Sequence, residues 1–417
     1  MVKHTGGLTS ADTTPRFVFV MNRNRDGYEV PLALEEGGML DCFITDFYAP
    51  DHRRIWLPNF LRRRTRAGLP SARLRLSWAS FILQYASEML RLPMHRVFPL
   101  TDGMLARKAA RAARRRRSGL YAYSSYLNLD VRLHDKLPLI DFEYHPHPDL
   151  GFALLQADYV EYPEVAWSFA LEEAAMSNQQ TGNAWRKADA VVCASTMTQK
   201  SLEYAGCDPK RITVIPYGLE DSNSEVCQRE KGVCRFLFVG QGLQRKGLHH
   251  LARAWRIAAP AGSTLTVVSY RIDPGIAAML DLPGVQVIGY QSREELETLY
   301  SRSDVFIMPS IVEGFGLVYL EALRHGCHVV ATENTGVLDL KLSRKAATIV
   351  PVGSINLLAE AITALSVRKS IGSLDPQAIR NEAEGWSWRD FRTAIGKHAI
   401  RVWDKKAADA HLMATSS

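Results

Sequence analysis

The sequence predicts an α/β protein with two domains, each built around a parallel sheet. At 417 residues the chain is too long for one hydrophobic core and suits two domains of about 200 residues. Short apolar runs of strand length alternate with helical periodicity along both halves, which favours β-α-β units and parallel sheets. One such unit, residues 304–332, contains a glycine-rich loop that can approach a ligand closely.

The first strand-helix-strand unit lies near the start of the chain. We expect a strand over residues 16–21, a helix over 28–34 that stops at Gly37 and Gly38, and a strand over 42–45. Ligands of parallel sheets gather at the carboxyl ends of the strands. The loop 22–27 is therefore a candidate substrate-binding element.

A strongly basic segment follows. Residues 51–120 contain 17 Lys or Arg against three acids, a net charge of +14, whereas the remaining chain carries about −7. Trp56, Phe60 and Trp78 are among the apolar residues interleaved with the arginines. This pattern predicts a surface over residues 51–119 that contacts an anionic membrane, although a solvated helix face explains it equally well. Nucleic acid is not expected as a partner, because no recognisable binding motif is present.

The middle of the chain shows a second series of elements. A strand over residues 137–144 ends in His145-Pro146-His147-Pro148, where the prolines fix the chain direction. A helical run over 161–187 leads to a strand over 190–194, with Ser195 and Thr196 as helix-cap candidates and Gly206 as the stop. A strand over 212–218 is followed by the polar segment 221–231, which we interpret as a linker.

The second half repeats the pattern. Expected strands cover residues 234–239, 265–268, 285–288, 305–308 and 328–331, and an amphipathic helix covers 387–402, where Trp386 and Trp388 are expected to pack. Gly240 and Gly242 suggest a dinucleotide fingerprint, but the third glycine, Gly247, stands five residues on rather than three. The fingerprint therefore fails.

The loop after residues 305–308 combines glycines with carboxylates. Gly314 and Gly316 give the backbone freedom, and the unpaired N–H groups at the start of the next helix suit a phosphate. Glu313 lies before that helix and Glu321 in its second turn, and carboxylates accept hydrogen bonds from paired hydroxyls. Such a site fits a sugar, a diphosphate and a ribose in a row.

The run Glu313-Gly314-Phe315-Gly316 through Glu321 resembles the E-x7-E signature of retaining nucleotide-sugar glycosyltransferases, most closely glycosyltransferase family 4. The resemblance is strong from residue 190 to 335 and nearly absent from 50 to 135. It implies the GT-B fold, in which two Rossmann-like domains face each other across a cleft. The implied divisions are residues 1–220 on the acceptor side, the linker 221–231, residues 232–385 for nucleotide-sugar binding, and 386–417 as a helix crossing back.

The resemblance also implies roles for residues of the donor site. Glu313 would meet the donor sugar and Glu321 the ribose. The loop residues Gly314, Phe315, Gly316 and Leu317, together with Lys246 and Arg245, would neutralise the departing diphosphate. Gln241 stands where the family usually has an arginine. Since a glutamine brings no charge, we expect Arg245 to supply part of the missing cation.

Other positions are implied with less detail. His145, with His147 as the alternative, would face the donor and acceptor sugars. The turn Gly289-Tyr290 would hold the nucleobase through backbone groups, and the loop at Thr335-Gly336 would contact phosphate. The loop 22–27 would belong to the acceptor side.

The implied activity is metal-independent, retaining sugar transfer from a nucleotide sugar to a sugar or lipid-linked acceptor in polysaccharide or glycoconjugate synthesis. The donor is a co-substrate, so no cofactor is expected, and the lack of a D-x-D motif predicts no metal. A non-catalytic GT-B binding subunit of a polysaccharide assembly complex and a nucleotide-sugar epimerase are the alternatives. The polar first 15 residues predict a cytoplasmic protein, peripheral on the inner membrane face if residues 51–119 bind lipid. Six scattered cysteines predict reduced thiols.

Overall fold

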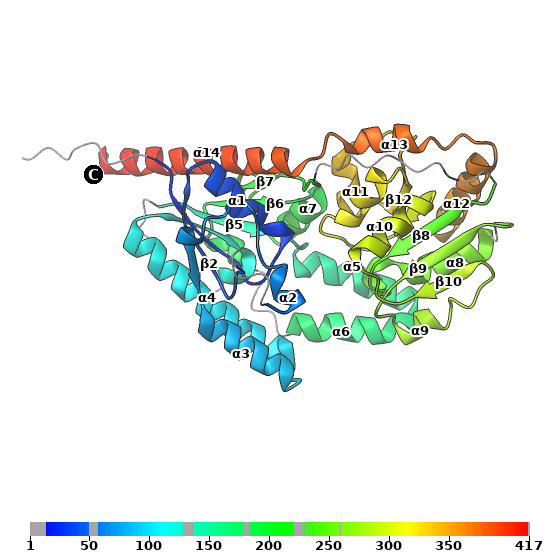
Figure 1. Ribbon diagram of the computed structural model, residues 1–417, viewed down its shortest axis with the longest axis horizontal. Helices are drawn as coiled ribbons and strands as arrows, with labels where there is room; N and C mark the ends of the chain where they lie inside the picture. The colour runs from blue at the N-terminus through cyan, green and yellow to red at the C-terminus, as the bar shows by residue number, and fades with distance from the viewer. Residues whose placement is uncertain are drawn as a thin grey trace, which may run out of the picture. The chain divides into compact units, whose positions relative to one another are not determined.

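The computed structural model describes residues 14–49, 57–127, 137–177, 183–220, 229, 232–258 and 260–415. Within these residues the chain forms two parallel sheets flanked by helices (Figure 1). This architecture confirms the predicted α/β class. The expected linker, apart from Arg229, and the basic segment's Trp56 lie outside the described residues.

The first sheet has the strand order β3-β2-β1-β4-β5-β6-β7, and the second has the order β10-β9-β8-β11-β12-β13. The strands are β1 (Phe17–Val20), β2 (Leu40–Thr45), β3 (Leu74–Leu76), β4 (Gly119–Tyr123), β5 (Leu139–Glu143), β6 (Ala190–Cys193), β7 (Ile212–Val214), β8 (Arg235–Val239), β9 (Thr264–Val268), β10 (Val285–Ile288), β11 (Val305–Ile307), β12 (His328–Thr332) and β13 (Ala347–Val350). Register places Val18 beside Cys42 and Leu120, and Val305 beside Phe236 and His328.

The helices connect and cover these strands. They are α1 (Glu29–Glu36), α2 (Asn59–Arg62), α3 (Trp78–Met89), α4 (Met94–Arg116), α5 (Pro148–Glu161), α6 (Ala166–Ser177), α7 (Thr196–Tyr204), α8 (Leu248–Ala258), α9 (Pro274–Ala277), α10 (Arg293–Arg302), α11 (Leu317–Arg324), α12 (Ile355–Ser370), α13 (Pro376–Ala383) and α14 (Trp388–Thr415). Among the described helices, none combines the length and apolar character needed to cross a membrane.

Most expected elements are present, and the exceptions have physical reasons. The helix predicted over 161–187 is wrong at its start. α5 already begins at Pro148, and a short turn at Pro163–Val165 interrupts the helical structure before α6. Sequence analysis missed α3 and α4 in the basic segment. The buried face of α4 consists largely of alanines (Ala106, Ala109, Ala110 and Ala113), so large apolar residues do not mark its periodicity.

The described chain divides into two compact units. The first contains the residues up to Phe142, residues 183–190 and the residues from Arg392 onward; the second contains 143–177 and 191–391. All residues that the sequence assigns to the donor site, and both candidate histidines, lie in the second unit.

Aromatic side chains form the centre of the first unit. Phe19 contacts Phe43, Tyr121 and Tyr123 with ring centroids 5.6 to 6.0 Å apart. Trp403 of α14 packs edge-on against Phe17 at 5.7 Å. The guanidinium of Arg392 lies 2.6 Å from Glu29 and 2.8 Å from Glu36, so ion pairs join the same helix to α1.

The cysteines agree with the predicted reduced state. The five described cysteines are buried and free, whereas Cys227 lies outside the described residues. Burial raises the pKa of the Cys42 thiol to about 11, which keeps it protonated at neutral pH.

Asp102 on α4 provides a test of the first unit's electrostatics. Burial raises the pKa of its carboxyl group to about 6, although Asn22 donates a hydrogen bond to it and arginines lie nearby. An unfolded aspartate titrates near about 3.9, so the folded state holds an extra proton between these values and loses stability as the pH rises through them. We expect Asp102→Asn to raise the free energy of unfolding at pH 7 by up to about 3 kcal/mol.

The measurement is urea unfolding at pH 4 and pH 7, with the exposed Asp281→Asn as the control. The gain should be seen at pH 7 and shrink toward pH 4. An equal gain at both pH values would contradict the titration argument.

Candidate active site

A strand, a loop and a helix form the centre of the site. The buried strand β11 ends at Ile307, and α11 begins at Leu317 after Gly316, whose φ is +85°. This confirms the strand-loop-helix prediction. A side chain at Gly314 would lie 2.6 Å from the Tyr144 carbonyl oxygen, and one at Gly316 would lie 2.5 Å from the Tyr319 ring. The protein's own packing therefore requires both glycines.

A second loop is locked against the first. The turn Gln244–Lys246 follows β8 and ends at Gly247, whose φ is +67°. A side chain at Gly247 would lie 1.9 Å from the carbonyl oxygen of Pro309, so only glycine permits this approach. The N–H of Ile311 donates to the carbonyl of Arg245 at 2.9 Å. These contacts bring Arg245 and Lys246 to the Glu313 loop.

Glu313 is the point where the charges converge. Its side chain is 9% exposed, its carboxylate pairs with the Lys246 ammonium, and Arg245 Nη1 lies 3.6 Å from the other oxygen. Burial alone would raise the pKa of Glu313, but Lys246, Arg245 and more weakly His145 outweigh burial and hold that pKa at about 2. Burial lowers the pKa of Lys246.

This arrangement has a consequence for ligand binding. Glu313 is ionised throughout the physiological range and occupies the two cations that were expected to meet a diphosphate. An incoming phosphate competes with the carboxylate for Lys246 and Arg245, which frees carboxylate oxygens to accept hydrogen bonds from hydroxyl groups.

Glu321 lies in a separate environment on α11. The hydroxyl of Tyr300 donates to its carboxylate at 3.2 Å, and the Tyr300 ring stacks on His325 with centroids 5.6 Å apart. Burial raises the pKa of Glu321, partly opposed by the Tyr300 hydrogen bond and Arg324. A carboxyl group held in this way presents oxygen atoms to a polar ligand without a strong ion pair.

Gln241 and Tyr290 lie after β8 and β10. The Gln241 amide donates to the hydroxyl of Tyr270, which is 64% exposed, and Tyr290 is 72% exposed. Among the described residues, no hydrogen bond or ion pair joins Gln241 or Tyr290 to Glu313. The structure thus brings together Arg245, Lys246 and Glu313 and leaves these two residues at the surface.

The two candidate histidines differ in their surroundings. His147 is buried, and its Nδ1 accepts from the N–H of Asp149 at 3.3 Å as the N-cap of α5. His145 is exposed, and its ring lies 4.4 Å from that of Tyr144. His147 therefore has a structural role, whereas His145 is accessible and contributes to the electrostatics of Glu313.

Hydrogen bonds from α7 hold the glycine loop, and sequence analysis did not foresee them. Ser195 caps α7 as expected, and its hydroxyl also donates to the carbonyl of Gly314. Thr198 Oγ1 donates to the same carbonyl at 3.3 Å. More than a hundred residues separate these partners, so no local pattern reports the contact.

The loop at Thr335-Gly336 supports the same region from another side. Thr335 is buried and accepts a hydrogen bond from the N–H of Val337 at 3.3 Å. A side chain at Gly336 would lie 2.5 Å from the Phe315 ring, which itself packs edge-on against Tyr217 at 5.4 Å. In this structure Thr335 and Gly336 pack beside Phe315.

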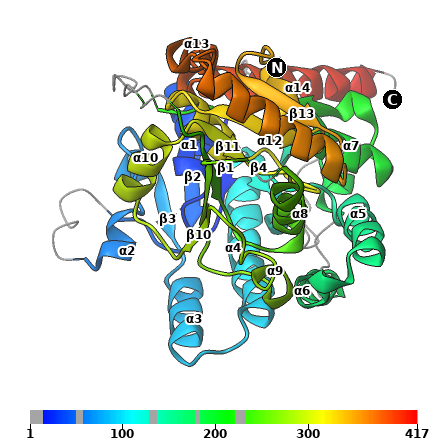
Figure 2. The ribbon, with the colours of Figure 1, turned by 90° about the vertical axis from the view of Figure 1, so that its right-hand side faces the viewer.

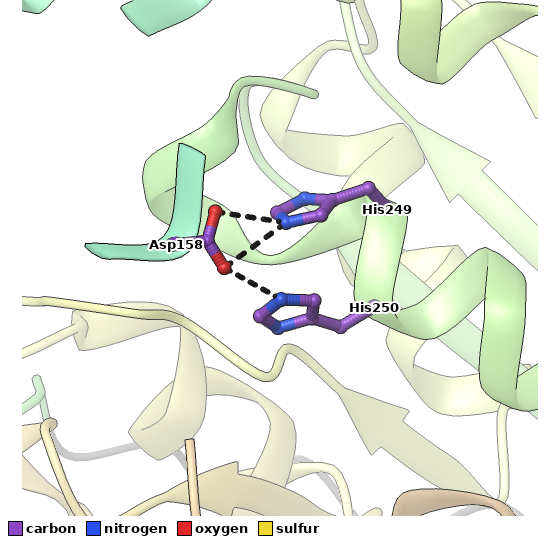
Figure 3. A group of neighbouring side chains, drawn as sticks. All are labelled: Asp158, His249 and His250. Atoms are coloured by element: carbon purple, nitrogen blue, oxygen red, sulfur yellow. Dashed lines mark hydrogen bonds and ion pairs between the residues drawn. The ribbon is translucent and has the colours of Figure 1, made fainter. Parts of the chain in front are cut away.

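Behind the turn 244–246 lies a buried group of Asp158, His249 and His250 (Figure 3). His249 Nε2 is 3.1 Å and His250 Nε2 is 2.7 Å from the Asp158 carboxylate. The Nδ1 atoms of both histidines have no partner among the described residues, whereas a metal-bound histidine normally donates its other N–H. Direct pairing of two imidazoles with one carboxylate fits this group better than a metal does.

This group anchors the cation-bearing turn. Gln244, the neighbour of Arg245, donates from Nε2 to Asp158 at 2.8 Å and to the carbonyl of Leu155 at 2.7 Å. This group could not be predicted from the sequence, because two adjacent histidines on a helix do not indicate which distant residue they contact. Asp158 and Gln244 thus connect α5 to the loop that presents Arg245 and Lys246.

The close approach at Gly247 can be tested by substitution. Gly247→Ala places a side chain at positive φ and against the Pro309 carbonyl. Gly353→Ala is the matched control, because Gly353 has φ +76° with nothing within 4 Å of an added side chain. We expect about 1 to 3 kcal/mol of destabilisation from the backbone alone, and a further 1 to 3 kcal/mol, roughly, from the clash at Gly247 only.

Chemical denaturation of both variants measures this difference. Equal losses for Gly247→Ala and Gly353→Ala would show that the two loops can separate at little cost.

Comparison with known proteins agrees with this geometry. Residues 234–367 match the family described as glycosyl transferases group 1. The amylovoran biosynthesis glycosyltransferase AmsK of Erwinia amylovora is 26% identical over 196 residues, which are 43% of this chain and 47% of the relative. The chain thus spans about half the length of the curated relatives it matches.

Solved structures match over nearly the whole chain. Sucrose-phosphate synthase from Thermosynechococcus elongatus has a TM-score of 0.60 at 15% identity and covers 94% of this chain and 100% of its own. Anabaena Alr3699/HepE in complex with UDP and glucose has a TM-score of 0.56 at 15% identity, covering 93% and 100%. The chain therefore has the GT-B fold, and its residues 234–367 match the model of the glycosyl transferases group 1 family.

Proposed function

We propose that this chain is a retaining glycosyltransferase that moves a sugar from a nucleoside diphosphate to an acceptor hydroxyl. One observation carries the proposal: Arg245, Lys246 and Glu313 converge where β8 and β11 end, next to α11 with Glu321. Because solved HepE structures contain UDP with glucose and UDP-glucose, a UDP-sugar is the proposed donor. Residues 232–385 are the proposed donor domain and residues 1–220 the acceptor domain.

The proposed mechanism follows from the charges. The donor diphosphate takes the place of Glu313 on Lys246 and Arg245, and Glu313 then accepts hydrogen bonds from the sugar. As the anomeric carbon–oxygen bond breaks, the two cations stabilise the leaving diphosphate. The acceptor oxygen attacks from the face that the phosphate leaves and its proton passes to the departing phosphate oxygen, so configuration is retained. In this proposal the accessible His145 contacts the reacting sugars.

Two relatives suggest a role in polymer synthesis. AmsK acts in amylovoran biosynthesis by its name, and CapM of Staphylococcus aureus is a capsular polysaccharide biosynthesis glycosyltransferase. We therefore place the chain in polysaccharide or glycoconjugate synthesis, with a sugar or lipid-linked acceptor.

Helix α3 supports membrane attachment. Trp78, Ile82, Tyr85 and Met89 recur on one face and are 43 to 71% exposed. Ser80, Gln84 and Ser87 are buried on the opposite face. Figure 2 shows α3 beside α4 at the periphery of the first unit. A helix that exposes its apolar face and buries its polar face needs an apolar environment to cover the exposed side.

The charge of the same segment supports an anionic membrane as that environment. α4 follows α3 after a turn at residues 90–93 and carries Arg107, Lys108, Arg111 and three arginines in its last turn. Basic residues beside an apolar helix face favour the interface of an anionic bilayer. The proposal is thus a cytoplasmic enzyme that lies on the inner face of the membrane.

The two cations of the site give the first functional test. We expect Arg245→Ala and Lys246→Ala to lower turnover of the donor by comparable factors, about ten- to hundredfold, since each removes a charged hydrogen bond to the diphosphate. Gln241→Arg should be tolerated or mildly activating. The exposed Arg302→Ala is the control and should retain full activity.

Release of nucleoside diphosphate from UDP-, GDP- and ADP-sugars measures the turnover. Full activity of Arg245→Ala would show that Arg245 does not contact the donor. If the unmodified protein turned over none of the donors, the proposed enzymatic activity would be wrong.

Membrane attachment is tested with vesicles. The double variant Ile82→Ser, Met89→Ser should bind anionic vesicles several-fold more weakly, because it removes exposed apolar area. Val160→Ser is the control, since Val160 is 80% exposed on α5. Binding to the anionic vesicles should also weaken with salt, as the screening length falls to about 3 Å near 1 M.

Co-sedimentation with anionic and neutral vesicles provides the measurement. Equal binding to neutral vesicles would contradict the electrostatic part of the proposal, and unchanged binding of the double variant would contradict the role of α3.

A further inference from the structure

The first unit contains a pocket that the donor site does not use. It has a volume of about 290 Å³ and lies between the loop after β1, the end of α2 and one side of α3. Its walls include Arg23, Arg63, Arg64, Phe81, Tyr85 and Glu88. Three guanidinium groups thus face one carboxylate in a pocket formed by a single unit.

Two of these arginines are held in place from behind. Arg64 is buried and forms a two-pronged ion pair with the buried carboxylate of Asp46, with Nη1 at 2.8 Å from Oδ2. Only 11% of its side chain is exposed, so Arg64 adds positive charge to the pocket wall rather than free donors. Arg23 lies 2.5 Å from Glu88 and stacks over the ring of Phe98 at 4.9 Å. The pocket therefore has preformed cationic walls.

Arg63 adds a free cation. It is exposed, and within the described part of the chain its guanidinium makes no hydrogen bond or ion pair. The Arg63 guanidinium is a set of donors that no described residue fills, and its fork geometry matches phosphate oxygens. A neutral ligand would leave these donors unpaired, whereas a phosphate or diphosphate would fill them.

The rest of the pocket suits a sugar next to an apolar chain. Phe81 and Tyr85 stack with an interplanar angle of 12° and centroids 6.0 Å apart, which provides a flat apolar wall. Glu88 and Asn24 supply acceptors and donors for hydroxyl groups. Tyr85 also belongs to the exposed apolar face of α3, so the pocket opens beside that face.

We infer that this pocket binds the acceptor through a phosphate or diphosphate group, and that the acceptor is a phosphate-linked sugar whose lipid chain follows the apolar face of α3. The inference rests on the proposed glycosyl transfer and specifies the acceptor class. Arg63 and Arg64 meet the phosphate, the ring of Tyr85 meets the sugar, and the lipid chain lies along Ile82 and Met89.

The experiment measures binding by calorimetry in the double variant Arg245→Ala, Lys246→Ala, which lacks both donor-site cations and so weakens binding of the probes at that site. The probes are glucose 1-phosphate, farnesyl-diphosphoryl glucose and neutral methyl glucoside. We expect both phosphate probes to bind, the farnesyl compound more tightly, and methyl glucoside not to bind. Arg63→Ala should weaken binding of the phosphate probes about ten- to hundredfold.

Arg73→Ala is the matched control, because Arg73 is also exposed in the same unit but pairs with Glu35 outside the pocket. Binding that is the same for methyl glucoside and the phosphate probes, or that survives Arg63→Ala, overturns the inference. Equal affinity for glucose 1-phosphate and the farnesyl compound overturns its lipid part and leaves a soluble sugar phosphate as the acceptor.

A second readout separates this inference from the proposed function. In the otherwise unmodified protein, Arg63→Ala should slow transfer to the farnesyl acceptor, whereas the control Arg73→Ala should leave that transfer unchanged. Absence of donor turnover would contradict the proposed function. Calorimetry alone decides whether the pocket binds phosphate.

Discussion

The organisation of the second unit depends on one balance of charge, the buried carboxylate of Glu313 between Lys246 and Arg245. Neither a lone carboxylate nor a lone ammonium can be buried at acceptable cost, so the three groups require each other. Because the carboxylate keeps its charge, the cations remain charged and aimed at one point before any ligand arrives. The same contacts determine which ligand the site binds. A diphosphate brings anionic oxygens to the two cations, as the Glu313 carboxylate does in the free protein.

Several contacts between distant segments hold Lys246, Arg245 and Glu313 in their relative positions. Gly247 lets the cation-bearing turn touch Pro309, and Ser195 and Thr198 fix the carbonyl of Gly314. Asp158 and its two histidines hold Gln244 from behind. Each contact joins segments far apart in sequence and uses backbone or buried polar groups, which cannot shift without leaving a donor or acceptor unpaired.

The first unit combines a well-packed aromatic core with a helix whose apolar face is exposed. Its aromatic core around Phe19 is well packed, yet α3 buries polar groups and exposes apolar ones, opposite to the usual order. The pocket with Arg63 adjoins that exposed face. Cations, aromatic rings and an apolar ridge in one place form a surface suited to an amphiphile, and this joins the proposed membrane attachment to the proposed acceptor.

The sequence by itself determined the fold class, most strand positions and the strand-loop-helix around Glu313, because periodicity and glycine placement are local signals. The resemblance of their loop to one in glycosyltransferase family 4 also identified Lys246 and Arg245. Only the tertiary structure decided that both cations meet Glu313, that His147 caps a helix while His145 stays accessible, and that Asp158 supports Gln244. It likewise revealed the inverted face of α3 and the pocket of Arg63. These features depend on which distant segments become neighbours and on which face of a helix is buried, and no local pattern encodes either.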